Sequence, residues 1–279
     1  MSTTSAIAGR TGRVILLGAG PGDPDLLTVR AARALADADL LLYDALVDRR
    51  VLELAPHAQR FFVGKRRGRA AMEQSTINAL LIRAASRRRV VVRVKAGDPF
   101  VLGRGAEEAL ACEAAGIRCE VIPGLTSAIA GPAAFGIPVT HRGVAPGFLV
   151  LSAAPSIHYE RVLARLVPGS VTVVLMMALA ARTAITAFLL EAGWPADLPA
   201  AIVVGATSPG AWSWTGRLDA LGDVTVPEDR AELPGLVVLG HVVSLSEAVT
   251  RASAIDSSAA VSPQHPSEEE APWQRRRVP

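Results

Sequence analysis

Hydrophobic positions along the chain gather in short continuous runs, and longer amphipathic segments separate these runs. Short runs rich in valine, isoleucine and leucine indicate buried strands, whereas apolar residues at helical spacing indicate helices. The predicted strands are residues 14–17, 39–43, 61–63, 90–94, 119–122, 148–152, 171–177, 201–204 and 235–243. The predicted helices include residues 28–36, 72–83, 107–115, a small-residue helix ending at 134, and 181–192. This alternation predicts an α/β fold, with a largely parallel sheet in the first half.

Composition divides the chain into two folded parts. Residues 143–147, Gly-Val-Ala-Pro-Gly, have the composition of a linker. We therefore expect an N-terminal α/β domain over residues 13–142 and a C-terminal α/β domain over residues 148–250. The ends of the chain, residues 1–12 and 251–279, are predicted to be disordered, the second because its serines, prolines and glutamates cannot bury a core.

Several predicted strands of the first half end in loops rich in glycine, proline and aspartate. The central loop contains Gly97, Asp98 and Pro99 and follows strand 90–94, and similar turns follow residues 14–17 and 119–122. In open α/β sheets, ligands bind at the carboxyl ends of the strands, and glycine lets the backbone approach them closely. An ordinary strand–loop–helix connection is the alternative interpretation.

The first of these loops argues against a dinucleotide cofactor. Residues 18–24 resemble the glycine fingerprint of a dinucleotide-binding turn. However, Asp23 stands where the third glycine is required, and Pro21 lacks an amide donor. We therefore reject NAD and FAD and expect a tight turn that faces another ligand.

Charged residues supply further candidates. Asp44 directly follows strand 39–43 and is expected to face the same cleft. Lys65 and Arg66 begin a run of four positive charges in five residues. Such a loop either faces an anionic ligand or is a solvated charge run, and the residues alone leave both interpretations open.

Composition narrows the classes of partner. The chain has 279 residues, of which 50% are hydrophobic, and a net charge of +3. No basic stripe interleaved with aromatic residues favours nucleic acid, and no apolar run reaches the roughly 18 residues of a membrane helix. The two cysteines have no partners at metal-ligand spacing, and the N-terminus lacks the pattern of a signal peptide. We expect a cytoplasmic protein without a metal and without a nucleic-acid or membrane partner.

A series of motifs points to a family. Along the first half, the chain carries, in order, GAGPGDPDLLT, YDALV, VGKR, GDPFVLGRGAEE, PGLTSA and GIPVTHR. Together these motifs resemble the uroporphyrinogen-III C-methyltransferase branch of the tetrapyrrole methylases, and the likeness extends over residues 13–245. The resemblance implies two α/β domains with S-adenosylmethionine (SAM) in the cleft between them, no metal, and a homodimer.

The resemblance also implies which residues form the site. Asp44 and Lys65 match positions expected to matter for catalysis. The positions that match SAM contacts are Pro21, Ala96, Gly97, Asp98, Val101, Thr126, Ser127, Met177 and Ala206. These residue types suit the ligand, because a sulfonium cation and an amino-acid moiety need carbonyls and a carboxylate nearby, and an adenine needs an apolar slot such as Val101 and Met177 would line.

The chain departs from the family pattern at two segments expected on the substrate side. Residues 151–155 lack the expected histidine, and residues 208–214 replace a polar turn with one that contains Trp212 and Trp214. We assign Arg66, Trp212 and Trp214 to substrate binding. The alternative is that both tryptophans are strand or core residues with no ligand role.

These departures favour a flat, electron-rich, mostly neutral ring over a ring with many carboxylates. The narrowly preferred function is a SAM-dependent C-methyltransferase that methylates a pyrrole- or indole-type ring, with C3 of an indole in a natural product as the acceptor. The alternative is a uroporphyrinogen-III C-methyltransferase that makes precorrin-2 for sirohaem or cobalamin. A SAM-binding regulator without catalysis is a third possibility, and the presence of both Asp44 and Lys65 argues against it.

Overall fold

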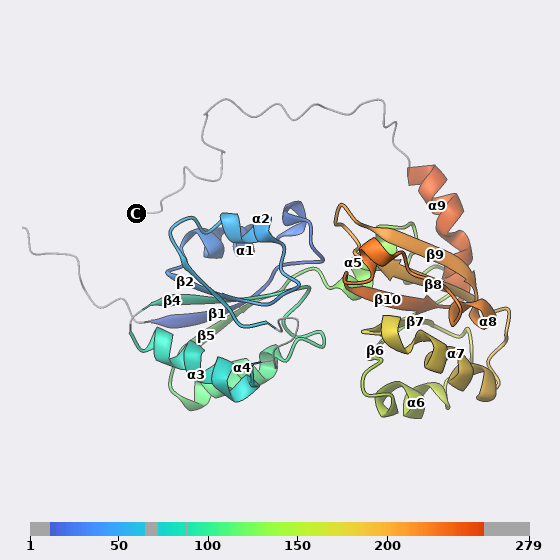
Figure 1. The fold of residues 1–279 in the computed structure, drawn as a ribbon, viewed down its shortest axis with the longest axis horizontal. Helices are drawn as coiled ribbons and strands as arrows, with labels where there is room; N and C mark the ends of the chain where they lie inside the picture. The colour runs from blue at the N-terminus through green and yellow to red at the C-terminus, as the bar shows by residue number, and fades with distance from the viewer. Residues whose placement is uncertain (1–11, 65–71, 88, 254–279) are drawn as a thin grey trace, which may run out of the picture.

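The computed structural model describes residues 12–64, 72–87 and 89–253 as two lobes, each built around one sheet (Figure 1). An α/β fold with two α/β parts is thus confirmed. Within the described residues, no helix combines the length and the apolar character needed to cross a membrane.

The N-terminal sheet has five parallel strands in the order β3-β2-β4-β1-β5. The strands are β1 (Arg13–Gly18), β2 (Leu40–Tyr43), β3 (Gln59–Phe62), β4 (Val90–Lys95) and β5 (Arg118–Ile122). All residues of β4 are buried, because this strand has neighbours on both edges and helices on both faces. All five carboxyl ends therefore lie at one edge of the sheet, as predicted for a ligand site.

Helices cover both faces of this sheet (Figure 1). They are η1 (Pro24–Leu26), α1 (Val29–Ala36) and α2 (Arg49–Glu53) on one face and α3 (Gln74–Ala85) and α4 (Gly105–Ala114) on the other. One apolar cluster packs α1 and α2 on the sheet through Leu35 and Val51. A second cluster packs α3 and α4 through Leu81 and Cys112. The alternation of strand and helix seen in the sequence follows from this layered packing.

The C-terminal sheet is mixed and has the order β6-β7-β10-β8-β9. Its strands are β6 (Phe148–Ser152), β7 (Thr172–Met176), β8 (Pro199–Val204), β9 (Trp212–Arg217) and β10 (Gly235–Leu239). Only β6 and β7 pair in parallel, and the other neighbours are antiparallel. The remaining helices are α6 (Ile157–Leu163), η2 (Leu179–Ala181), α7 (Arg182–Glu191), α8 (Leu218–Leu221), η3 (Glu228–Arg230), η4 (His241–Leu245) and α9 (Ser246–Ser253).

Helix α5 (Ser127–Ala133) links the two lobes. It follows β5 of the N-terminal sheet, yet it packs on the C-terminal sheet, where Ala128 joins a core with Val174 and Val203. Ile137 and Ala145 belong to the same core. The chain therefore passes from one lobe to the other before α5, upstream of the linker predicted at residues 143–147. Small side chains on α5 let the helix lie close to the C-terminal sheet. Which sheet the helix packs on depends on the tertiary structure, so the sequence pattern did not reveal it.

Strand β9 was not among the predicted strands. Its residues Trp212 and Trp214 are half-buried and pack against the core between the C-terminal sheet and helices α6, α7 and α8. Trp214 also covers Gly216, where a Cβ atom would stand 2.3 Å from the indole ring. The sequence alternates large and small residues here, which is the available signal for a half-buried edge strand.

Candidate functional site

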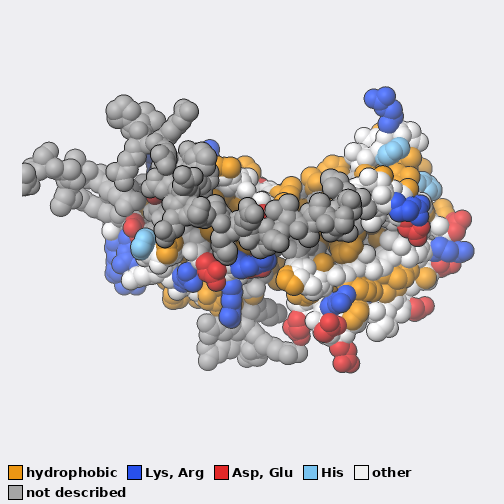
Figure 2. Space-filling view, turned by 90° about the horizontal axis from the view of Figure 1, so that it is seen from above, with side chains coloured by type: hydrophobic (Ala, Val, Ile, Leu, Met, Phe, Trp, Pro, Cys, Tyr) orange, Lys and Arg blue, Asp and Glu red, His pale blue; other side chains and the backbone are white. Residues whose placement is uncertain are grey.

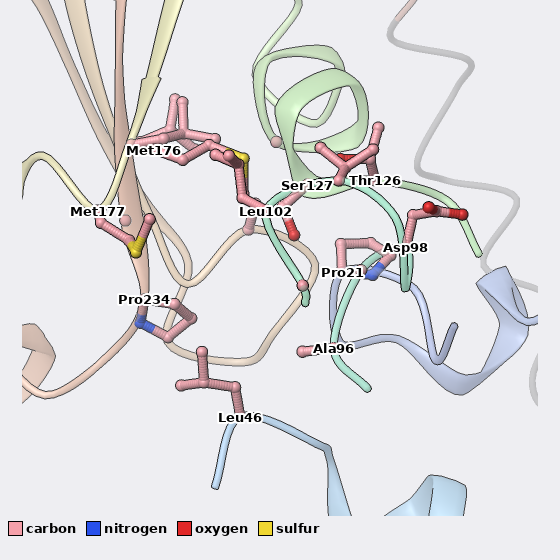
Figure 3. A pocket seen from close by; sticks show the side chains of 18 of the residues that line it. Pro21, Leu46, Ala96, Asp98, Leu102, Thr126, Ser127, Met176, Met177 and Pro234 are labelled. Carbon is pink, nitrogen blue, oxygen red and sulfur yellow. The ribbon is translucent and has the colours of Figure 1, made fainter. Parts of the chain in front are cut away.

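A pocket of about 330 Å³ lies between the two lobes, at the carboxyl ends of the N-terminal strands (Figure 3). This volume lies at the lower end of the range of small-molecule sites. The lining residues are Pro21, Leu46, Ala96, Gly97, Asp98, Val101, Leu102, Gly103, Thr126, Ser127, Gly131, Met176, Met177, Val203, Ala206, Glu232, Pro234, Gly235 and Leu236. Most of the wall is apolar, with a few polar groups placed on loops. Figure 2 shows the two lobes side by side, with hydrophobic side chains at the surface of both.

The structure brings together all the residues that the sequence matched to SAM contacts. Pro21, Ala96, Gly97, Asp98, Val101, Thr126, Ser127, Met177 and Ala206 all line this one pocket. They come from five different loops that span more than half of the chain. Sequence reasoning missed the other lining residues. Leu46 and Leu102 lie in loops that were already singled out, whereas the wall formed by residues 232–236 carried no recognisable signal.

Three strand-end loops of the N-terminal sheet meet backbone to backbone beneath the pocket. The amide of Gly97 donates to the carbonyl of Gly20 at 2.7 Å, and the amide of Gly20 donates to the carbonyl of Gly97 at 3.2 Å. A Cβ atom on Gly124 would stand 2.2 Å from the Gly97 carbonyl oxygen and 2.7 Å from Gly18. Only glycine permits so close an approach, and this explains why these motifs contain it.

Asp98 uses its carboxylate to hold two of these loops together. One oxygen accepts from the amide of Phe100 at 2.8 Å, and the other accepts from the amide of Gly124 at 3.0 Å. In Figure 3 the carboxylate points away from the pocket. Asp98 therefore shapes the pocket wall through its backbone, whereas the sequence suggested that its charge faces a bound cation.

Two large apolar residues form a wall shared with a second cavity. Leu102 and Met177 both have left-handed backbone conformations, with φ of 53° and 59°. Their side chains remain largely exposed, at 46% and 53%. Non-glycine residues with positive φ are uncommon and cluster at functional sites. The backbone thus directs both side chains into the space between the cavities.

The second cavity measures about 470 Å³ and opens between the β4–α4 loop and the segment that follows β6. Its polar lining residues are Ser152, Arg104, Glu107 and His158. Arg104 forms a 2.7 Å ion pair with Glu107, and this hydrogen-bonded contact raises the pKa of the arginine. The sequence suggested that this side of the cleft lacks a histidine, but α6 brings His158 to the wall from just beyond residues 151–155.

Asp44 lies outside both cavity linings, in the loop that supplies Leu46 to the first pocket. Its carboxylate accepts from the Nη2 atom of Arg93 at 2.7 and 2.8 Å. Arg93 also contacts buried Glu108, which in turn binds Lys95 at 3.0 Å. Burial, followed by the positive charge of Arg93, lowers the pKa of Lys95 below its usual value.

Of the other predicted substrate and catalytic residues, two are outside the described residues and two line neither cavity. Lys65 and Arg66 fall outside the described residues, directly after Gly64, where a Cβ atom would stand 2.5 Å from the Ala45 amide nitrogen. Trp212 and Trp214 line neither cavity, and both are half-buried and pack against the C-terminal core. Among the described residues, no group of three or more histidine, cysteine, aspartate or glutamate side chains could hold a metal ion.

Comparison with known families gives a match over most of the chain. Residues 13–222 match the family of tetrapyrrole (corrin/porphyrin) methylases. This span contains every loop that lines the pocket from the N-terminal lobe and most of the C-terminal strands.

Individual relatives support the same assignment. The chain is 38% identical over 240 residues to a uroporphyrinogen-III C-methyltransferase of Methanocaldococcus jannaschii. This alignment covers 84% of this chain and 98% of that protein. It is 42% identical over 245 residues to a siroheme synthase of a Psychrobacter species, covering 85% of this chain and 49% of that protein. The chain thus spans about half the length of that siroheme synthase.

A solved structure shares both sequence and fold with this chain. It is a uroporphyrin-III C-methyltransferase of Thermus thermophilus in complex with S-adenosylhomocysteine, the demethylated form of SAM. The two proteins are 41% identical, with a TM-score of 0.72. The match covers 84% of this chain and 100% of the Thermus thermophilus chain.

Proposed function

Because the chain belongs to the tetrapyrrole methylase family, we propose that it is a C-methyltransferase that transfers methyl groups from SAM to carbon atoms of uroporphyrinogen III. SAM is the methyl donor of its relatives, and the pocket between the lobes is where we place it in this chain. The observation that carries the proposal is the convergence of all the matched loop residues on that single pocket.

The residues of the pocket fit SAM. Apolar side chains such as Val101 and Met176 suit the adenosine, and the loop backbone around Gly97 offers polar groups for the charged ends. When bound, SAM supplies an electrophilic methyl group, and its sulfur takes the electron pair of the C–S bond as the new C–C bond forms. No contribution from a metal ion is needed for this displacement.

The residues of the chain contribute mainly alignment and shielding from water. Leu102 and Met177, on the wall shared by the two cavities, set the direction from which an acceptor carbon reaches the first pocket. Holding two reactants in line is worth roughly 7–11 kcal/mol in the best intramolecular models. Asp44 is our candidate for stabilising the positive charge that the acceptor ring gains, or for accepting its proton.

We propose that the acceptor occupies the second cavity and extends from it to the loop that carries Asp44 and Leu46. A ligand of this extent favours the tetrapyrrole over an indole. The apolar members Phe100 and Ala154 of the second cavity suit pyrrole rings, and His158 is a donor for a carboxylate arm of uroporphyrinogen III, whereas Arg104 is already paired with Glu107. The preference for an indole rested on Trp212 and Trp214, which pack in a core instead. The relatives described above are tetrapyrrole enzymes, which also supports this choice.

A side-by-side assay with isotope-labelled SAM tests the substrate. We expect methyl transfer to uroporphyrinogen III and none to indole or tryptophan derivatives. Transfer to an indole with none to uroporphyrinogen III would refute the proposal. A SAM-binding regulator would transfer to neither.

A matched pair of variants tests the cofactor pocket. Ala96→Leu adds a bulky side chain to the lining of a pocket of about 330 Å³ and should weaken SAM binding by at least about tenfold, because the added side chain would occupy space that the ligand needs. Ala164→Leu makes the same change at an exposed position at the end of α6 and should leave the affinity unchanged. Calorimetry measures both, and equal affinities would place SAM elsewhere.

A further inference from the structure

Arg93 occupies an unusual position for a charged residue. It lies within β4, at the centre of the N-terminal sheet, and its side chain is only 3% exposed. Each of its three guanidinium nitrogens has a partner. Nη2 contacts both oxygens of Asp44, Nε donates to Glu108 at 3.1 Å, and Nη1 donates to the carbonyl of Val94 at 3.1 Å. Both the position and the orientation of the guanidinium are therefore determined by the protein.

Glu108 anchors this arrangement from the interior. Its side chain is completely buried on α4, and one oxygen accepts from Arg93, from Lys95 at 3.0 Å and from Gln74 at 3.1 Å. The other oxygen is buried without a hydrogen-bond partner among the described residues. Two carboxylates and two cations thus form a cluster of balanced charge that joins β2, β4 and α4.

The exposure of the cluster is strongly one-sided. Glu108, Arg93 and Lys95 have side chains that are 0%, 3% and 6% exposed, whereas that of Asp44 is 30% exposed. Asp44 is therefore the only member with a substantial solvent-facing surface. It lies at the carboxyl end of β2, two residues before Leu46, which reaches the pocket (Figure 3).

Stability alone gives a weak reason to build such a cluster. Burying charges is costly, and replacing a buried ion pair by apolar residues of similar size is often neutral or stabilising. A free aspartate at the end of a strand would sample several rotamers, whereas this one is held by a guanidinium that is itself held by a buried glutamate. The cluster is suited to fixing one carboxylate at the edge of the cleft.

We propose that Arg93 is a positioning residue that fixes the Asp44 carboxylate for methyl transfer, and that Glu108 holds Arg93 in place. This inference rests on the proposed function for the role of Asp44. It assigns Arg93 no contact with the substrate or with SAM, so its whole effect on turnover passes through Asp44.

The test is a double-mutant cycle on turnover. Asp44→Asn and Arg93→Met should each lower kcat by about 100-fold, the scale expected for losing or misplacing an acid–base group. Adding Arg93→Met to Asp44→Asn should lower kcat by less than about threefold more, because the residue on which Arg93 acts is already disabled. Arg93→Lys retains the charge but cannot reach both Asp44 and Glu108, so its kcat should also fall by at least about tenfold.

Control measurements separate positioning from folding. SAM affinity should stay within about twofold of the wild type in all variants, since none of these residues lines the SAM pocket. Gln74→Met removes another partner of Glu108 and leaves the contact between Arg93 and Asp44 intact, so its kcat should stay close to that of the wild type. If Arg93→Met fails to fold, Arg93→Lys takes its place in the cycle.

Multiplicative losses in the double mutant would overturn the inference, because they would show that Arg93 acts independently of Asp44. Failure of the proposed function has a different signature, namely a wild type that does not methylate uroporphyrinogen III. In that event a crystal structure of Arg93→Lys tests whether Arg93 positions the Asp44 carboxylate. A displaced Asp44 carboxylate supports the positioning role, and an unmoved one refutes it.

Discussion

At the scale of single residues, the cleft uses carboxylates in two different ways. Both carboxylate oxygens of Asp98 accept hydrogen bonds from backbone amides, one in its own loop and one in the loop after β5. Asp98 is therefore part of the framework of the pocket. Asp44 is instead held by a side chain and retains an exposed surface. Two aspartates at strand ends, which look equivalent in a sequence, therefore have distinct roles because their hydrogen-bond partners differ.

The role of Asp98 leads to a prediction about both stability and binding. Asp98→Ala leaves the amides of Phe100 and Gly124 without their acceptors, and the loss at the partly buried Gly124 amide should cost about 1 kcal/mol, whereas the exposed Phe100 amide can turn to water. The loops should then shift, and SAM affinity should fall by at least about tenfold, measured by calorimetry together with a lower melting temperature.

The control for Asp98→Ala is Asp48→Ala. Asp48 caps α2 by accepting from the amide of Arg50 at 2.8 Å and lines neither cavity. Its loss should lower the melting temperature and leave SAM affinity unchanged. Equal SAM affinities for the two variants would contradict the framework role of Asp98.

At the scale of secondary-structure elements, the pocket depends on how closely the strand-end loops approach one another. The loops after β1, β4 and β5 touch through Gly18, Gly97 and Gly124, with no side chain between them. Parallel strands bring these loops to one edge, and the glycines let them close into a continuous floor.

Gly124→Ala should therefore disrupt the floor. The added methyl group would stand 2.2 Å from the Gly97 carbonyl oxygen, and the contact atom is backbone that cannot turn aside. Overpacking of this kind typically costs about 1–3 kcal/mol, so the urea midpoint should fall and SAM binding should weaken. Gly147→Ala is the control, because its nearest neighbour would be at 3.8 Å, and it should behave like the wild type. A normal urea midpoint for Gly124→Ala would argue against the tight floor.

At the scale of the whole molecule, the two lobes are joined across the cleft as well as through the chain. The amide of Asp23, in the loop after β1, donates to the hydroxyl of Thr207 at 3.2 Å. Thr207 follows β8 and has a left-handed backbone with φ of 65°. Its neighbour Ala206 and the nearby Pro21 both line the pocket, so this hydrogen bond closes one side of it.

Removing this bond should speed the release of the reaction product. Thr207→Val keeps the branched shape and removes the hydroxyl, and a single hydrogen bond is worth about 0.5–1.5 kcal/mol. S-adenosylhomocysteine should therefore dissociate about two- to tenfold faster, as measured by stopped-flow fluorescence. Thr207→Ser keeps a hydroxyl that accepts from the amide of Asp23, so it should release the product at the wild-type rate. Identical rates for Val and Ser variants would show that the contact does not restrain the cleft.

The homodimer implied by the family resemblance stays a prediction, as do the catalytic roles of Asp44 and Lys65. The pocket in which we place SAM is lined by residues from both lobes of a single chain.

The amino-acid sequence by itself indicated every strand except β9, the strand-end loops that line the pocket from the N-terminal lobe, and the family resemblance. Apolar runs such as residues 90–94 and glycines such as Gly124 are local signals, because strand burial and close backbone approach restrict the residue type at each position. For this reason every residue matched to a SAM contact reached the same pocket.

Only the tertiary structure decided which side chains meet. Asp44 and Arg93 are 49 positions apart, and Asp23 and Thr207 are 184 apart. No local pattern encodes such contacts, because they depend on strand order and lobe placement. The same reason explains Trp214, whose residue type suits a ligand wall or a core equally well. Packing against the C-terminal core decided between the two, since β9 pairs with β8 at the edge of the sheet and contacts α8.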